Sequence, residues 1–161
     1  MLFRSLPEGL RTDPEAMAET IENNVRKTIV DANPVNPKYY EHMSVLLDEL
    51  IVLRRQQAIE YQAYLKQIQD LSRQVLYPKQ QTNYPTTLDT APKRAFYDNF
   101  GQDADLAILI DRAIRDTKKA DWVGDRFKER EVANAIRMST QHYQLDIGAV
   151  MELAKAQREY H

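Results

Sequence analysis

Three charged residues, Asp111, Asp116 and Lys118, have types and spacing that could support metal-dependent hydrolysis. A metal-dependent nuclease uses carboxylates to hold Mg²⁺ and a lysine to polarise the attacking water. Asp116-Thr117-Lys118 supplies the acidic-x-Lys element, and Asp111 lies upstream as the first carboxylate. Such ligands usually come from adjacent strands, whereas both segments fall on a predicted helix. We therefore favour the competing interpretation, a solvated helix end.

Other common catalytic and cofactor motifs are missing from the sequence. The chain has no cysteine and only four glycines, which excludes disulfides and zinc–thiolate sites and leaves no glycine-rich phosphate loop. The three histidines, His42, His142 and His161, form no His-x-x-x-His pair, and no Gly-x-Ser-x-Gly elbow presents a serine. We predict no catalytic residue, no metal site and no cofactor in this chain.

Basic residues gather around the single tryptophan. This basic patch consists of Arg112, Arg115, Lys118, Lys119, Trp122, Arg126, Lys128 and Arg130. Arginines and aromatic side chains dominate the energetics of protein interfaces, so the patch is our candidate for partner binding. Carboxylates are interleaved with the cations, which favours a salt-bridged surface instead. Contact with nucleic-acid phosphates is a further alternative.

Tyrosine is frequent, with nine residues that include Tyr39-Tyr40 and the pair Tyr61 and Tyr64. On helices, this spacing usually places the rings at the edge of the core while the hydroxyls reach water. A stacking platform for nucleotide bases is the alternative. We expect the first arrangement.

Helices must position these residues, because apolar side chains recur at helical spacing along most of the chain. Met17, Ile21, Val25 and Ile29 form one such stripe. No segment alternates apolar and polar residues as a half-buried strand would, and no Asn-Gly or Asp-Gly hairpin turn occurs. The predicted fold class is all-α, an irregular bundle of six or seven helices.

Capping residues and prolines indicate where the first helices begin and end. Thr12 and Glu15 form a capping box at the first helix, and Asn33-Pro34 should end that helix. Asn36-Pro37 begins the second helix by the same logic. A tight break near Ala58-Ile59 should separate the second helix from a third, and one bent helix is the alternative.

The second half of the chain follows a proline-rich linker over residues 78–92, which shows no helical period. Gly101 is the expected left-handed C-cap of the first helix after this linker. Thr90 and Asp125 should cap two of the later helices, Asp103 should open another, and the last helix should begin at about Asp146.

The length of the chain suits one domain, and its net charge shows no basic surplus. The chain has 161 residues and a net charge of -2. We predict a single helical domain over 1–161, with N-terminal helices over about 12–77 and C-terminal helices over about 90–160. The near-balanced charge argues against a nucleic-acid footprint. No signal peptide or membrane-length apolar run is evident, so the expected location is the cytoplasm, away from membranes.

Several short stretches occur in a familiar order along nearly the whole chain. They are LPEGL (6–10), AETIENNVRK (18–27), NPKYYEHMS (36–44), LLDELI (46–51), YQAYL (61–65), FYDNFG (96–101) and KER (128–130). Together they resemble the helical C-terminal region of the restriction (motor, R) subunit of type I restriction–modification enzymes. In that family the full subunit is an ATP-dependent DNA translocase and endonuclease, with its nuclease and motor earlier in the chain.

The resemblance implies a non-catalytic assembly domain that holds the motor subunit against the methyltransferase–specificity core. The implied partners are the methyltransferase and specificity subunits, while ATP and Mg²⁺ act elsewhere in the parent. No catalytic residue is carried over, because none of the family's catalytic motifs has a counterpart here. We expect a fragment of a larger chain, and a free-standing protein is the alternative. A nucleic-acid-binding helical module that uses the basic patch is the alternative function.

Overall fold

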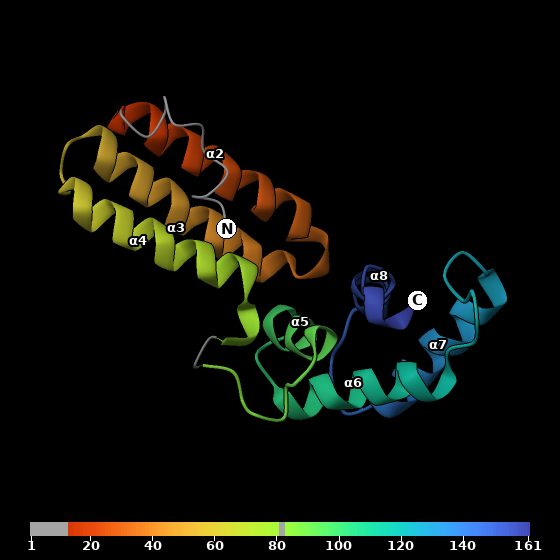
Figure 1. Ribbon diagram of the computed structural model, residues 1–161. Helices are drawn as coiled ribbons and strands as arrows, with labels where there is room; N and C mark the ends of the chain where they lie inside the picture. The colour runs from red at the N-terminus through yellow and green to blue at the C-terminus, as the bar shows by residue number, and fades with distance from the viewer. Residues whose placement is uncertain (1–12, 81–82) are drawn as a thin grey trace. The chain divides into compact units, whose positions relative to one another are not determined.

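The computed structural model describes residues 13–80 and 83–161, and these residues form helices without any strand. Within these ranges seven α-helices follow one another (Figure 1): α2 (Pro14–Ala32), α3 (Pro37–Arg55), α4 (Tyr61–Leu76), α5 (Ala91–Asn99), α6 (Ala104–Thr117), α7 (Arg126–Ser139) and α8 (Ile147–Lys155). Short 3-10 helices occur at Asn33–Val35, Pro78–Gln80 and Arg158–Tyr160. The all-α prediction is confirmed. None of the helices described is long and apolar enough to cross a membrane.

Helix boundaries follow the local capping signals closely. Asp13 is the N-cap of α2, and its carboxylate accepts hydrogen bonds from two backbone N–H groups of the first turn. The expected cap, Thr12, lies outside the described residues. The break near Ala58-Ile59 is confirmed, because α3 ends at Arg55 and Glu60 is the N-cap of α4. The single bent helix is therefore wrong.

The four later helices also begin where the sequence predicts them. The side chains of Thr90, Asp103, Asp125 and Asp146 each accept a backbone N–H at the start of a helix. Gly101 has a φ of 87°, the left-handed conformation that glycine adopts without a steric penalty.

Contacts divide the chain into two compact units. Unit 1 lies within Met1–Asn33 and Tyr40–Gln81, and unit 2 lies within Pro34–Tyr39 and Thr82–His161. The boundary falls inside the first turns of α3. A single domain over 1–161 would require these two units to associate. The single domain stays a prediction.

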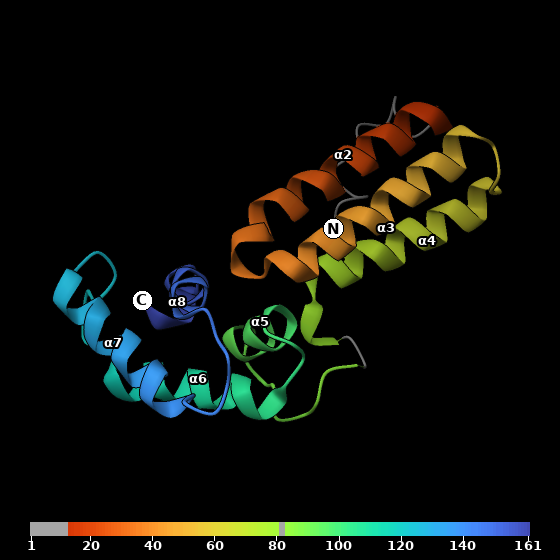
Figure 2. The ribbon, with the colours of Figure 1, turned by 180° about the vertical axis from the view of Figure 1, so that it is seen from behind.

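Unit 1 is built from α2, α3 and α4, which lie side by side in both views (Figures 1 and 2). The predicted stripe on α2 packs inward at Ile21, Val25 and Ile29, whereas Met17 is only half-buried. From α3 and α4, the side chains of Met43, Leu47, Leu50, Ile68, Leu71 and Val75 complete the core.

A carboxylate lies among these apolar side chains. Glu22 is buried, and it accepts hydrogen bonds from Arg54 Nε at 2.6 Å and from the Tyr64 hydroxyl at 2.7 Å. Burial, together with the bond to Glu22, raises the pKa of Tyr64. The expectation that the tyrosine hydroxyls reach water is therefore wrong for Tyr64. A buried carboxylate needs such partners, because an unpaired charge in an apolar interior is costly.

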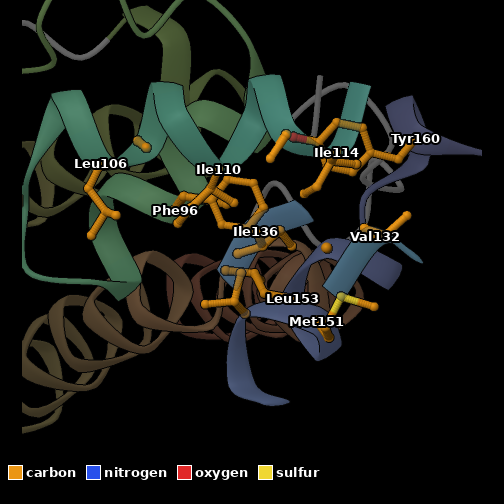
Figure 3. Packing of buried hydrophobic residues seen from close by; sticks show 14 of the residues in the cluster. Phe96, Leu106, Ile110, Ile114, Val132, Ile136, Met151, Leu153 and Tyr160 are labelled. Carbon is orange, nitrogen blue, oxygen red and sulfur yellow. The ribbon is translucent and has the colours of Figure 1, made fainter. Parts of the chain in front are cut away.

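Unit 2 packs one apolar core between α5, α6, α7 and α8. Phe96, Ile110, Ile136 and Leu153 come from these four helices in turn and converge in the core (Figure 3). Trp122 and Tyr160, which lie outside these helices, belong to the same cluster. Residues near both ends of unit 2 thus share one core.

Substitution of Glu22 by alanine is expected to destabilise the chain strongly. The change leaves the Arg54 guanidinium and the Tyr64 hydroxyl without their buried acceptor, at a cost of about 3 kcal/mol in the free energy of unfolding. The matched control is Asp48→Ala, which breaks the exposed ion pair with Arg26 and should cost less than about 1 kcal/mol. Urea denaturation followed by circular dichroism measures both. Equal losses would contradict a structural role for the buried carboxylate.

Candidate partner-binding surface

Trp122 lies in the core of unit 2 and not on its surface. Its side chain is 1% exposed, and Nε1 donates a hydrogen bond of 2.8 Å to the backbone carbonyl of Tyr160. The prediction that Trp122 forms an exposed aromatic centre of the basic patch is therefore wrong. The partner of the indole lies 38 residues away, so local sequence could not reveal it.

Asp111 anchors a second buried network beside this tryptophan. The Tyr160 hydroxyl donates to Asp111 Oδ1 at 2.5 Å, and Arg115 Nε donates to the same carboxylate at 2.9 Å. The Arg115 guanidinium also lies 5.2 Å from the centre of the Tyr160 ring and pairs with Glu159. Burial, with the bond to Asp111, raises the pKa of Tyr160. The contacts of Arg115 thus lie mainly within unit 2.

The residues proposed for metal-dependent hydrolysis do not come together. Asp111 is buried, whereas Asp116 is exposed on the same helix. Five residues on an α-helix correspond to a rotation of about 140°, so the two carboxylates point in different directions. Asp111 is already occupied by Tyr160 and Arg115. This arrangement contradicts the nuclease hypothesis for this trio.

The other cations of the basic patch fall into two groups. Lys119 pairs with Glu131 at 2.9 Å, and Lys128 Nζ donates to the carbonyl of Ala120 at 2.7 Å, so these two lysines are occupied by the fold. The remaining four make no ion pair with any residue that the structure describes: Arg112, Lys118, Arg126 and Arg130. The salt-bridged interpretation thus accounts for only part of the patch, and partner binding by its cations stays a prediction.

One hollow of about 330 Å³ lies beside Trp122. Its lining includes Lys118, Lys119, Tyr160 and His161. Lys119 is neutralised by Glu131, and the Asp121 carboxylate, which also lines the hollow, opposes the charge of Lys118. The hollow therefore has no surplus of positive charge that would select an anionic group.

Two apolar side chains outside the predicted site residues stand out on α7. Phe127 is 73% exposed and Met138 is 69% exposed. The buried residues of this helix are Val132 and Ile136. The spacing of apolar residues could have indicated that Phe127 is exposed. Phe127 lies five residues before Val132 and therefore off the buried stripe.

Removal of the Asp111 carboxylate is expected to destabilise unit 2. Asp111→Ala leaves the Tyr160 hydroxyl without its acceptor and removes the main partner of Arg115, which should cost about 3 kcal/mol in unfolding free energy. Tyr160→Phe removes only the hydroxyl and should cost about 2 kcal/mol. Asp116→Ala, on the same helix but exposed, is the control and should change stability by less than about 0.5 kcal/mol. A larger effect at Asp116 in thermal denaturation would overturn this ranking.

Searches against known protein families, curated proteins and solved structures found no match to this chain. The resemblance to type I restriction subunits accordingly stays a prediction.

Proposed function

We propose that this chain is a non-catalytic assembly domain of a type I restriction enzyme R subunit. In this proposal it tethers the ATP-dependent translocase and endonuclease subunit to the methyltransferase–specificity core. The resemblance of the ordered sequence stretches suggests the family. The all-α fold agrees with the helical region that these stretches resemble. The observation that carries the assembly role is the exposure of large apolar side chains on both units.

In unit 1, three valines project from α2 and α3. Val30 is 64% exposed, Val45 52% and Val52 49%. Val45 and Val52 lie about one turn on either side of Asp48, which pairs with Arg26 of α2. Val30 lies one turn beyond Arg26, so this ion pair brings the three valines toward one face of the α2–α3 pair.

These exposed valines have no evident role in the fold of unit 1. Valine is a weaker helix former than alanine, leucine or lysine, because its branched side chain loses rotational freedom in a helix. At exposed positions this cost is not offset by burial against the core. Apolar side chains gathered on a surface are typical of contacts with another protein. In unit 2, Phe127 and Met138 present a second exposed apolar surface.

Deletion of this region from the parent R subunit tests the proposal directly. We expect the truncated subunit to lose association with the methyltransferase–specificity core in size-exclusion chromatography with light scattering. Its DNA-stimulated ATPase activity, which the motor carries, is the control for correct folding. The isolated chain should also compete with the intact R subunit for the core. Unchanged association of the truncated subunit would refute the assembly role.

A nucleic-acid-binding module is the second candidate, and the unpaired cations favour it. Arg112, Lys118, Arg126 and Arg130 have no carboxylate partner among the described residues, so they are available to phosphates. Two observations oppose this candidate. Trp122 is buried and cannot stack on a base. The net charge of the chain is -2, and binding to phosphates depends on a local cationic surplus.

An electrophoretic shift series in increasing salt separates the two functions. The assembly proposal predicts no retarded band with duplex or single-stranded DNA, even at about 50 mM salt. Binding through four cations would instead give an affinity that falls with salt, with a logarithmic slope of up to about -4. In that case Arg126→Ala combined with Arg130→Ala should reduce the slope by about 2. A retarded band with this behaviour would favour the second candidate.

A further inference from the structure

The outward side of α7 carries the two most exposed large apolar side chains in the part of the chain that the structure describes. Phe127 and Met138 are 73% and 69% exposed. They are eleven residues apart, which is close to three full turns, so they lie on the same side of the helix about 16 Å apart. Asn134 lies between them on the same side. These three residues form a ridge along α7.

An edge of arginines runs along one side of this ridge. Arg126, Arg130 and Arg137 follow one another at helical spacing, rotated by about 60–100° from Phe127. None of the three pairs with a carboxylate of residues 13–80 or 83–161, and Arg137 donates only to the Asn134 side-chain amide at 2.9 Å. Their charges are therefore available to an external acceptor.

Both carboxylates within α7 are occupied by other groups. Glu131 pairs with Lys119, and Glu129 accepts hydrogen bonds from the Gly124 backbone N–H and from Lys155. Neither carboxylate compensates the arginine edge of its own helix. The outer face of α7 thus combines exposed apolar area with positive charge on one flank.

We propose that the α7 outer face, defined by Phe127, Arg130, Asn134, Arg137 and Met138, docks on a protein surface with an apolar groove bordered by carboxylates. Phenylalanine and methionine would bury apolar area in the groove, and the arginines would form charge-assisted hydrogen bonds with the carboxylates. Aromatic residues and arginine are the typical anchors of protein interfaces. This inference rests on the proposed function, and it places the groove on the methyltransferase–specificity core.

Charge complementarity favours a protein over DNA as the occupant. Phosphates would engage the arginine edge but leave Phe127 and Met138 in water. A protein groove accounts for the apolar ridge and for the arginines together. The edge lies on one flank of the ridge only, so the matching carboxylates should also lie on one side of the groove.

Binding of chain variants to the purified methyltransferase–specificity core tests the surface. Phe127→Ser should weaken binding about 30-fold, as expected of an interface anchor. Arg130→Glu combined with Arg137→Glu should weaken it by a similar factor or more. The matched controls are Tyr77→Ser, an exposed aromatic residue of unit 1, and Arg55→Glu, an exposed arginine of unit 1. Both controls should bind as the unchanged chain does, and circular dichroism checks that all variants fold.

Site-specific crosslinking supplies a second measurement. The chain has no cysteine, so Asn134→Cys provides one attachment point for a photoactivated crosslinker on the ridge. We expect a covalent adduct with the core from this position and none from Gln67→Cys, an exposed position on α4.

The outcomes separate this inference from the proposed function. Binding of the unchanged chain, with loss in the α7 variants alone, supports both. Equal binding by all variants overturns the α7 surface and leaves the assembly role standing. No binding of the unchanged chain refutes the assembly role and this surface with it. If the α7 substitutions abolish only DNA retardation or only self-association, the occupant is DNA or a second copy of the chain, and the inference is wrong.

Discussion

Buried carboxylates bonded to tyrosine hydroxyls hold the interiors of both units. In unit 1, Glu22 accepts from Tyr64 and Arg54. In unit 2, Asp111 accepts from Tyr160 and Arg115. A carboxylate removed from water is stable only when its oxygens receive hydrogen bonds and its charge is balanced. Each network therefore restricts how its helices can pack, since an altered register would leave a charged group without a partner.

These networks also determine which residues are free to act on other molecules. Asp111 and Arg115 have residue types that suit catalysis or phosphate binding, yet their contacts lie within unit 2. Trp122 is similarly fixed by its bond to the Tyr160 carbonyl. Exposed apolar side chains and arginines without carboxylate partners remain on the described surface. Burial of apolar area is the main favourable term in association, so such side chains can contribute to contacts with another protein.

Much of the helical architecture follows from local interactions. Asp103, Asp125 and Asp146 begin helices because their side chains accept backbone N–H groups only two or three residues ahead. The break before Glu60 and the left-handed Gly101 are equally local. Such features depend on residues that are adjacent in sequence, so the order of helices and the all-α class could be predicted before any tertiary contact was known.

The sequence by itself therefore determined the helices, their caps and the residue types available for binding. Only the tertiary structure decided which of those residues reach the surface. Trp122 and Tyr160 are buried because segments 38 residues apart meet, and the Tyr160 hydroxyl finds its acceptor 49 residues away. The same packing leaves Phe127 exposed on α7. Contacts over such separations depend on how whole helices pack, which no local pattern of caps or apolar spacing encodes.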